Sequence, residues 1–280
     1  MLQDLEFDRL ENEFRNISAG AEDVILCFHE GNVLLRREAD GALTLPTLSR
    51  MAAWQAPTAP RYLFRMQERN FFLWTDAAPL SPDDGFAYEP ARPLRQLKSK
   101  DVCFAIMTGW HLYNWYRANR FCGCCGSPTQ HDSKERMLRC PNCGNMIFPR
   151  ISPAVIVAVT DGDRILLSKY AGRAYTHYAL LAGYTEIGET LEQTVHREVL
   201  EEVGLRVRNL RYYKSQPWGV DGNVLMGFFC DVDGDDVIHI DESELAMAAW
   251  YHRDALPAHD DGISLTREMI RIFEEGKEPK

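Results

Sequence analysis

The sequence predicts an α/β protein that ends in an α/β/α sandwich with a mixed sheet. Strand and helix signals alternate from Ile151 to the C-terminus, and layered folds are built from such alternation. Five of the eight cysteines lie between residues 122 and 143 and mark a separate module. Paired strand signals and one helix signal come before it. We therefore expect a mixed α+β N-terminal domain at 1–117, a cysteine domain at 118–149 and the sandwich at 150–280.

The N-terminal segment contains two hairpin signals, a loop and a helix. Alternating apolar residues on both sides of short polar turns are typical of β-hairpins. They occur at Val24–Phe28 with Val33–Arg37, and at Arg61–Gln67 with Phe71–Thr75. The Pro, Asp and Gly residues of Pro79–Pro93 predict a loop. A helix should then start after Ser99, a residue type favoured at N-caps. We find no catalytic constellation in this segment.

Two C-x-x-C turns, Cys122–Cys125 and Cys140–Cys143, are separated by fourteen residues. Such turns can place four thiolates tetrahedrally around Zn²⁺, whereas a redox role would need only one turn, in a strand–helix context. Cys124 leaves Cys122/Cys124 as an alternative pair, but equal spacing on both sides favours Cys125. The expected zinc ligands are Cys122, Cys125, Cys140 and Cys143. Because all four are cysteines, no coordination position stays open for water, and the zinc is expected to be structural.

The C-terminal segment contains strands and helices in alternation. A hairpin is expected where Ala154–Thr160 and Ile165–Ser168 flank Asp161-Gly162-Asp163. Ala179–Gly183 then leads into a helix. The remaining elements are a helix at Leu191–Val203, strands at Asn209–Ser215, Val224–Asp231 and Ala248–His252, and a last helix at Leu265–Glu274.

Composition and charge narrow the function classes. No apolar stretch is long enough to span a membrane, and the first residues lack the basic and apolar regions of a signal peptide, so a cytoplasmic protein is expected. The formal net charge is −10, the wrong sign for a protein that grips long nucleic acid through its phosphates. A small anionic substrate is still compatible, because bound divalent metals neutralise charge locally.

The helix at Leu191–Val203 carries acidic residues next to its buried face. Its expected caps are a Thr190/Gln193 capping box and Gly204. Its apolar stripe consists of Leu191, Val195, Val199 and Val203. A solvated acidic face would lie opposite that stripe. At about 100° per residue, however, Glu198 and Glu202 border the stripe, and Glu201 lies one step further round. Carboxylates held this close repel one another, and a hard cation such as Mg²⁺ or Mn²⁺ relieves the repulsion.

The segment Gly183–Leu205 resembles the Nudix box, G-x₅-E-x₇-R-E-U-x-E-E-x-G-U with U an aliphatic residue, and it fills every specified position. Members of this family use divalent metals to hydrolyse a nucleoside diphosphate linked to another group. The resemblance implies metal ligands at Glu198, Glu201 and Glu202. It also implies that Arg197 orients these carboxylates. The general base would be one of the carboxylates or a glutamate from a neighbouring loop.

The order of modules resembles the zinc-ribbon NADH pyrophosphatase (NAD diphosphatase) subfamily. Its F-C-G-x-C-G turn corresponds to Phe121–Gly126, and the likeness runs from Trp110 to the C-terminal helix. Ser215–Trp218 matches the opening of the subfamily's S-Q-P-W-P-F-P-x-S specificity motif, but Gly219–Gly222 departs from the rest. The departure leaves the preferred dinucleotide open. Without the resemblance, Ser215–Trp218 would be interpreted as a strand end with a buried tryptophan.

Further site residues are implied by the resemblance. Gln216 and Trp218 belong to the specificity motif. Phe148 and Tyr184 match positions that stack on a nucleobase or nicotinamide, although by themselves they would be interpreted as a core and a loop residue. Glu244 opens a segment that resembles E-L-x-x-A-x-W, where the glutamate contributes to metal binding or catalysis. Its alternative interpretation is one more charge in an acidic run.

The expected activity is metal-dependent hydrolysis of the pyrophosphate of NADH or NAD⁺ to nicotinamide mononucleotide and AMP. The resemblance also implies removal of NAD caps from RNA 5′ ends and a homodimeric enzyme. Two alternatives stay open. One is a Nudix pyrophosphatase for ADP-ribose or a dinucleoside polyphosphate. The other is a zinc-ribbon binding protein with a degenerate Nudix domain. Degeneration would first remove Arg197 or a metal-site glutamate, and all of these are present.

Overall fold

The computed structural model describes residues 1–5, 10–54, 59–74, 84–92, 99–172, 177–257 and 263–280. Contacts within the chain divide this protein into two compact units. The first contains Met1, Ile151–Trp218 and Asn223–Lys280, and the second contains Leu2–Arg150 and Gly219–Gly222. Buried apolar residues form separate hydrophobic clusters in each unit.

The first unit is built on a six-stranded mixed sheet. Its strands are β11 (Ser152–Asp161), β12 (Arg164–Tyr170), β13 (Leu181–Tyr184), β14 (Val207–Trp218), β15 (Asn223–Val232) and β16 (Leu245–His252). They follow the order β14–β15–β11–β12–β16, and β13 pairs with β11 beside this path. The pairing of β11 with β15 is parallel, and the other pairings are antiparallel. The predicted mixed sheet is therefore confirmed.

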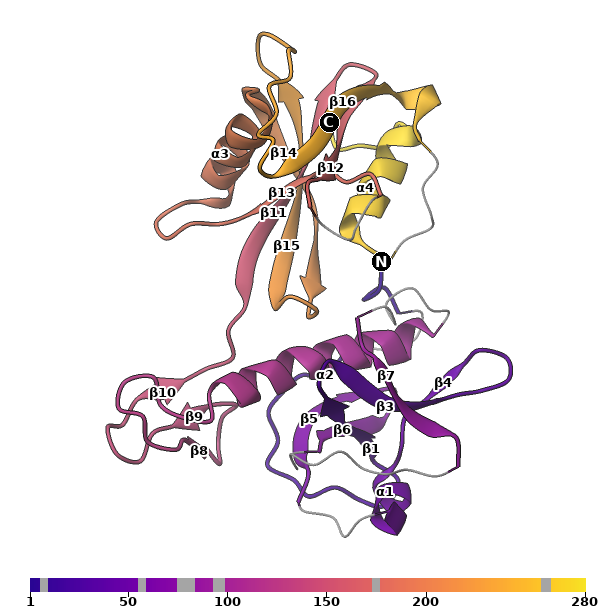
Figure 1. Ribbon diagram of the computed structural model, residues 1–280, viewed down its shortest axis with the longest axis vertical. Coiled ribbons are helices and arrows are strands. Elements are labelled where there is room, and N and C mark those ends of the chain that lie inside the picture. Colours follow the sequence, from indigo (N-terminus) through magenta and orange to yellow (C-terminus); the bar gives the residue numbers. More distant parts are fainter. Residues whose placement is uncertain (6–9, 55–58, 75–83, 93–98, 173–176, 258–262) are drawn as a thin grey trace. The chain divides into compact units, whose positions relative to one another are not determined.

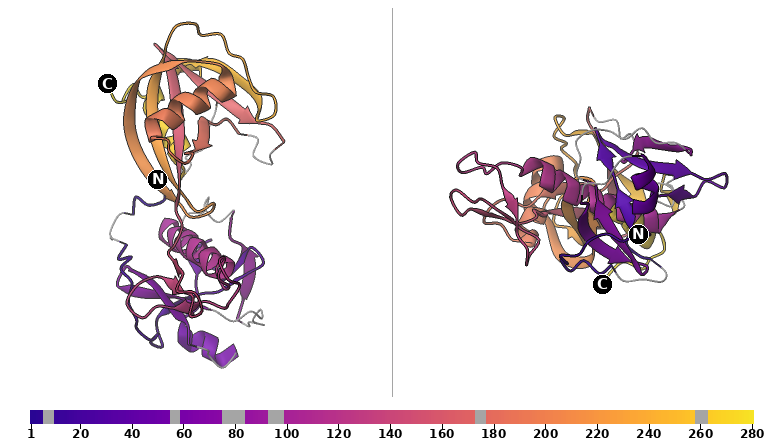
Figure 2. Two further views of the ribbon diagram at one scale, coloured as in Figure 1. Left: turned by 90° about the vertical axis from the view of Figure 1, so that its left-hand side faces the viewer. Right: turned by 90° about the horizontal axis from the view of Figure 1, so that it is seen from below.

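Helices α3 (Leu191–Val203) and α4 (Leu265–Glu274) cover opposite faces of this sheet (Figure 1), and α3 stands in front of it in the left view of Figure 2. Successive side chains of a strand point to opposite faces. In β11, Val155 therefore belongs to the apolar cluster with Val195 of α3, and Ile156 belongs to the cluster with Met269 of α4. The predicted α/β/α sandwich is confirmed.

The sequence around α3 sets both of its ends. The Thr190 hydroxyl accepts a hydrogen bond from the backbone N–H of Gln193 at 3.2 Å, and the Gln193 side chain accepts one from the Thr190 N–H at 2.8 Å. At the other end Gly204 is left-handed, with φ 70°. Glycine is the residue that adopts this conformation without a steric penalty. The predicted capping box and glycine C-cap are both confirmed.

The second unit combines small sheets with two helices among its described residues. One sheet contains β1 (Val24–Leu26), β6 (Arg69–Leu73) and β5 (Arg61–Met66). Another contains β2 (Phe28–His29), β3 (Asn32–Arg37), β4 (Leu43–Thr44) and β7 (Phe86–Pro90). The cysteine module forms β8 (Gln130–His131), β9 (Leu138–Arg139) and β10 (Met146–Ile147). The helices are α1 (Leu48–Trp54) and α2 (Lys100–Ala118).

Helix α2 packs closely on the first of these sheets. A Cβ atom added at Gly109 would lie 2.2 Å from Cδ1 of Leu26, so a larger residue there would force the Leu26 side chain to shift. The helix begins after Ser99, as predicted, but the Ser99 side chain makes no capping hydrogen bond. No described helix combines the length and the apolar character that a membrane span needs.

Two predictions for the N-terminal segment need correction. The strand predicted at Val24–Phe28 is divided, because β1 pairs in parallel with β6 and only β2 forms the short hairpin with β3. The loop predicted at Pro79–Pro93 contains β7, which pairs with β3. Residues 75, 79–83 and 93 lie outside the described residues. The hairpin of β5 and β6 is confirmed.

Candidate functional site

The four predicted zinc ligands come together in the second unit. The Sγ atoms of Cys122, Cys125, Cys140 and Cys143 all lie within 4.8 Å of one another. Sγ of Cys122 lies 3.6 Å from Sγ of Cys143, and Sγ of Cys125 lies 3.4 Å from Sγ of Cys140. Tetrahedral Zn²⁺ with bonds of about 2.3 Å needs sulfurs about 3.8 Å apart, so the four thiols fit this ion. Cys124 is exposed and outside the group.

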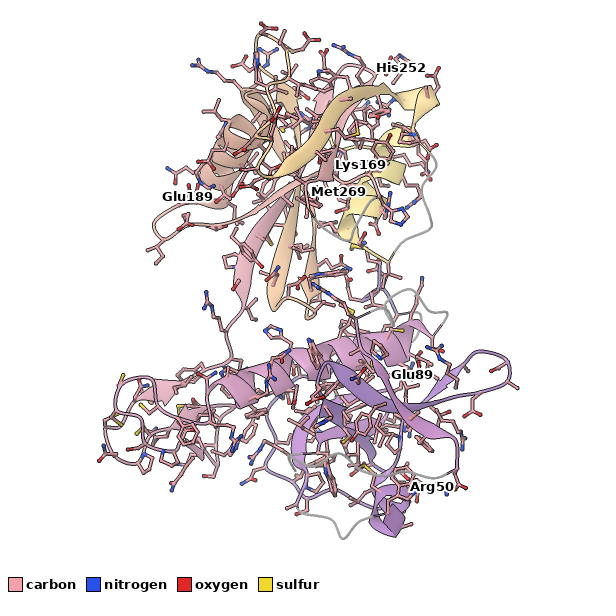
Figure 3. All side chains as sticks on the ribbon, viewed as in Figure 1. Arg50, Glu89, Lys169, Glu189, His252 and Met269 are labelled. Carbon is pink, nitrogen blue, oxygen red and sulfur yellow. The ribbon has the colours of Figure 1, made fainter. Side chains whose placement is uncertain are left out.

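In the first unit, Arg197 holds a set of carboxylates together. Its Nε donates to Glu189 Oε1 at 2.6 Å and its Nη2 donates to Glu189 Oε2 at 2.9 Å. Its Nη1 donates to Glu198 Oε1 at 2.7 Å and to Glu201 Oε2 at 2.9 Å. Nη2 of Arg197 also donates to the backbone oxygen of Tyr184 at 2.9 Å. One guanidinium therefore fixes three carboxylates and the end of β13, and Glu189 is on α3's side of the sheet in Figure 3.

The environments of Glu189 and Glu198 shift the pKa values of these two carboxyl groups in opposite directions. Hydrogen bonds from Arg197, and from the backbone N–H of Glu186, lower the pKa of Glu189 to about 2. Burial raises the pKa of Glu198, and the Arg197 guanidinium opposes that effect. The negative charges of Glu201 and Glu244 add to the increase. Glu189 is therefore a fixed anion that balances Arg197, whereas the ionised form of Glu198 calls for additional positive charge nearby.

Glu198 lies directly against the backbone of β13. A Cβ atom added at Gly183 would come within 1.9 Å of its Cδ and 2.0 Å of its Oε1. The carboxylate therefore occupies the space that any other residue at position 183 would fill. This contact explains sterically why the Gly183–Leu205 segment begins with a glycine. The spacing of the motif alone did not reveal this.

The other acidic residues of the set differ in exposure. Glu202 is buried, whereas the side chain of Glu201 is 58% exposed. This agrees with the helix geometry used above, because Glu198 and Glu202 border the apolar stripe. Glu244 lies just before β16, and its negative charge contributes to the raised pKa of Glu198.

The donor chemistry of this set fits a divalent cation. All its side-chain donors are carboxylate oxygens, which suit Mg²⁺ or Mn²⁺. Among the described residues, only the cysteines form a ligand group as tight as 4.8 Å. Arg197 Nη1 donates to Oε1 of Glu198 and to Oε2 of Glu201, so it holds each of these carboxylates through one of its two oxygens. The Glu201 side chain is also largely exposed.

Comparisons with known proteins agree with this arrangement. The NUDIX domain family matches residues 150–272, and the NADH pyrophosphatase zinc ribbon domain family matches residues 117–148. A protein from Chromobacterium violaceum named NAD-capped RNA hydrolase NudC is 37% identical over 216 residues, which cover 77% of this chain and 81% of that protein. The chain belongs to the Nudix hydrolases. Its zinc ribbon places it in the NADH pyrophosphatase subfamily, as the sequence predicted.

Other relatives and structures match over smaller shares. A NudC of the same description from Pectobacterium atrosepticum is 39% identical over 179 residues, covering 63% of this chain and 68% of that protein. A solved NUDIX hydrolase from Nitrosomonas europaea aligns with a TM-score of 0.49 at 24% identity, covering 56% of this chain and 91% of that chain.

Two of the four predicted substrate-binding residues of this Nudix enzyme come close to one another in the first unit. The Tyr184 hydroxyl donates to Oδ1 of Asn223 at 3.2 Å, and Trp218 pairs with Asn223 across β14 and β15. Tyr184 is 51% exposed and Trp218 is half-buried. Asn223 was missed by the sequence interpretation, because it lies beyond the segment that departs from the specificity motif. Its link to both aromatic residues depends on strand pairing that spacing does not show.

Gln216 occupies a different environment from the one that the motif implied. Its side chain is fully buried. Its Nε2 donates to the backbone oxygen of Ile263 at 2.9 Å, and its Oε1 accepts from the backbone N–H of Leu265 at 2.7 Å. Gln216 therefore attaches the start of α4 to β14, and it does not offer its amide to a ligand in this structure.

Phe148 belongs to the second unit, just after β10 and close to the cysteine module in sequence. Its side chain is 53% exposed. The alternative interpretation as a core residue is therefore wrong, and an exposed ring is compatible with stacking on a planar ligand.

Proposed function

We propose that this protein hydrolyses the pyrophosphate of NADH or NAD⁺ to nicotinamide mononucleotide and AMP, and that it removes NAD from the 5′ end of capped RNA. The observation that carries the proposal is the carboxylate set of Glu189, Glu198 and Glu201 around Arg197, together with buried Glu202 on the same helix. The zinc ribbon and the printed names of the relatives favour a dinucleotide substrate over other Nudix substrates.

In this proposal Glu198, Glu201, Glu202 and Glu244 hold Mg²⁺ or Mn²⁺. A bound divalent metal would neutralise charge on the pyrophosphate oxygens and lower the pKa of a bound water. Arg197 keeps Glu198 and Glu201 in place through two short hydrogen bonds. A carboxylate of this set accepts the proton of the attacking water. One phosphorus–oxygen bond forms to that water, and the bond from the attacked phosphorus to the bridging oxygen breaks.

The remaining residues of the proposal bind the substrate or support the fold. Tyr184, Trp218 and Phe148 present aromatic rings for stacking on the adenine or nicotinamide. Cys122, Cys125, Cys140 and Cys143 hold a structural zinc. We also propose a cytoplasmic homodimer. Sedimentation equilibrium tests the dimer, since a single species at the chain mass of 32.1 kDa would contradict it.

The first experiment measures AMP release from NADH, NAD⁺, ADP-ribose and diadenosine polyphosphates with Mg²⁺ or Mn²⁺. Fastest turnover of NADH supports the proposed substrate. Faster turnover of ADP-ribose would instead favour the second candidate, a Nudix pyrophosphatase for another nucleoside diphosphate. The departure at Gly219–Gly222 is the observation that keeps this candidate open.

A matched pair of variants tests the catalytic assignment. Glu202→Gln keeps the size of the buried side chain and removes its charge, and we expect kcat to fall roughly 100-fold or more. Glu242→Gln makes the same change at an exposed position outside the set and should retain full activity. Equal metal-dependent activity of the two variants, and of Glu201→Gln, would remove the carboxylate set from the mechanism.

A further inference from the structure

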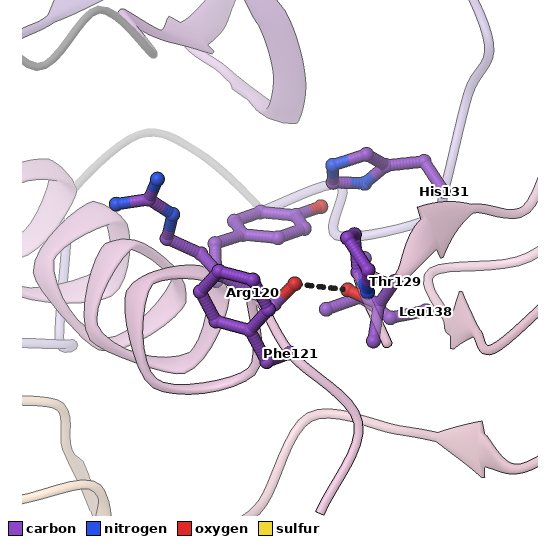
Figure 4. Close-up of a pocket in the computed structure, with 7 residues that line it drawn as sticks. Arg120, Phe121, Thr129, His131 and Leu138 are labelled. Carbon is purple, nitrogen blue, oxygen red and sulfur yellow. Dashed lines mark hydrogen bonds between the residues drawn. The ribbon is translucent and has the colours of Figure 1, made fainter. Parts of the chain in front are cut away.

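A pocket in the second unit is lined by residues to which no role has been assigned above. Its volume is about 380 Å³, and it opens between the end of α2 and the zinc ribbon. Among its lining residues are Tyr116, Arg120, Phe121, Thr129, His131 and Leu138. Figure 4 shows Arg120 and Phe121 on one side of the pocket and His131, Thr129 and Leu138 on the other.

Aromatic rings make up much of this pocket. The rings of Tyr116 and His131 have centroids 5.1 Å apart. Phe121 is 58% exposed, so its ring faces solvent at the pocket instead of packing in the ribbon. Burial and the charge of Arg61 lower the pKa of His131 to about 4, so the imidazole is neutral at pH 7. An exposed aromatic ring such as that of Phe121 is a platform on which a nucleobase stacks.

Three arginines lie at the pocket or act on its Tyr116 ring. The guanidinium of Arg61 lies 5.6 Å from the centroid of the Tyr116 ring, and its buried Nε has no hydrogen-bond partner. Within the part of the chain that the structure describes, Arg136 donates to the neutral oxygens of Asn12 and Leu63. Among the described residues, no carboxylate forms an ion pair with Arg61, Arg136 or Arg120. These arginines therefore bring positive charge to the pocket without a paired carboxylate among the residues that the structure describes.

The local charge contrasts with that of the whole chain. Residues 110–150 carry six basic and two acidic side chains, whereas the chain as a whole carries 31 and 41. A zinc ion with four thiolates contributes two negative charges, which the basic side chains of this stretch still outweigh. An acidic protein with one basic, aromatic region attracts a polyanion to that region.

The rim of the pocket is fixed before any ligand arrives. The Thr129 hydroxyl contacts the backbone oxygens of Asn119 at 2.7 Å and Arg120 at 3.3 Å, and the second contact is drawn in Figure 4. The backbone N–H of Thr129 also donates to the Arg120 oxygen at 3.0 Å. These bonds fix the backbone at Arg120, where the side chains of Arg120 and Phe121 begin, so binding a ligand there costs little further backbone entropy.

We propose that this pocket binds one nucleotide of a single-stranded RNA, with the base stacked on Phe121 and a phosphate on Arg120. The proposal rests on the proposed function, since the RNA is the chain that follows the NAD cap. A free mononucleotide offers the same chemistry, a planar base with a phosphate. The experiments below separate the two sources.

The first test uses an uncapped, fluorescently labelled hexanucleotide RNA and measures its anisotropy on titration with the zinc-loaded protein. Phe121→Ala should weaken binding about tenfold, which is within the range for loss of one stacked base. Arg120→Ala should also weaken binding, because it removes the phosphate contact. Phe121→Tyr keeps an aromatic ring and should restore binding. Arg208→Ala removes an exposed arginine from the first unit and should bind as the parent does.

The salt dependence of the RNA affinity distinguishes the phosphate contact of Arg120 from base stacking on Phe121. Loss of one phosphate contact should reduce the slope of log affinity against log salt by about 0.7 in Arg120→Ala. Phe121→Ala should keep the parent slope, because stacking releases no counterions. Equal affinity of parent, Arg120→Ala and Phe121→Ala overturns the proposal. If Phe121→Ala loses zinc, Arg120→Ala and Phe121→Tyr decide the outcome.

Competition with AMP and steady-state kinetics show whether the pocket binds RNA or a free mononucleotide. AMP that displaces the hexanucleotide at equal concentration would make the pocket a free-nucleotide site and overturn the RNA proposal. With the RNA proposal correct, Arg120→Ala raises KM about tenfold for an NAD-capped RNA and leaves kcat and KM for NADH unchanged. Failure of the parent to hydrolyse NADH or capped RNA would remove the proposed function, but it would leave the hexanucleotide binding result as it stands.

Discussion

Gly183 leaves room for the carboxylate of Glu198, and the methyl group of an alanine at this position would take up that room. Gly183→Ala would force the Glu198 carboxylate away from β13, since the added atom would come within 1.9 Å of Cδ. The Glu198 carboxylate lies at the end of a flexible side chain, so the fold should tolerate the substitution. A displacement of about 1 Å at a catalytic group can reduce activity about 100-fold. We expect such a loss of kcat, with the melting temperature changed by less than about 4 °C.

The control for this variant is Gly123→Ala. Gly123 has an ordinary φ, and a Cβ atom there would meet nothing within 4 Å. Its activity should equal that of the parent. Full activity of Gly183→Ala would show that the position of Glu198 against β13 is unimportant for hydrolysis.

The ion pair between Arg197 and Glu189 should appear in the pH dependence of stability. The pKa of Glu189 is lowered from 4.5 to about 2, mainly by hydrogen bonds from Arg197. A lowered pKa contributes stability above the unfolded-state pKa, and this contribution disappears as the pH falls through the folded-state value. In Arg197→Gln the free energy of unfolding should therefore fall less steeply between pH 4.5 and 2 than in the parent. Urea titrations across this range measure both slopes, and parallel slopes would contradict the assignment.

At the scale of the element, the C-terminus of α3 depends on a glycine for two reasons. Gly204 has φ 70°, and a Cβ atom there would lie 3.0 Å from Cβ of His239. Gly204→Ala should lower the free energy of unfolding by about 1–2 kcal/mol from the left-handed backbone alone. Gly162→Ala is the control, because Gly162 has a similar φ of 59° and a Cβ atom there would have no neighbour within 4 Å. Urea denaturation should show the larger loss for Gly204→Ala, and equal losses would mean that the His239 contact is relieved without cost.

The elements that could be predicted from the sequence are those fixed by local signals. The bounds of α3 and α4 were predicted correctly because caps and apolar periodicity act within a few residues. The strand β7 was missed because Pro and Gly surround it, although its pairing with β3 stabilises it. The parallel pairing of β1 with β6 joins residues far apart in sequence, such as Val24 and Phe71, and no local pattern predicts it.

The same distinction holds for the candidate site. The acidic residues of α3 could be predicted because helix geometry places Glu198 and Glu202 beside the buried stripe. The environment of Gln216 could not, because its two partners, the backbone groups of Ile263 and Leu265, are distant in sequence. The contacts of Asn223 could not be predicted for the same reason, since strand pairing brings it to Trp218 and its side chain accepts a hydrogen bond from Tyr184.

At the scale of the whole molecule, the two predicted metal sites lie in different units. The cysteines belong to the second unit and the carboxylates to the first. Cys125→Ser should therefore lose zinc, while Mn²⁺ binding by the carboxylates is retained. Cys124→Ser changes the neighbouring thiol, which lies outside the group of four, and should keep one zinc per chain. Metal analysis and Mn²⁺ titration measure both quantities. Zinc loss from Cys124→Ser alone would restore the alternative pair Cys122/Cys124.

The position of Gln216 has a consequence for enzyme engineering. Residues of a specificity motif are the usual first targets when substrate preference is altered, but this amide anchors α4 to β14 through both of its polar atoms. Random replacement there would select for folding before it selected for a new substrate. A library aimed at a different dinucleotide should keep Gln216 constant and vary Trp218 and Tyr184, whose rings are at least partly accessible.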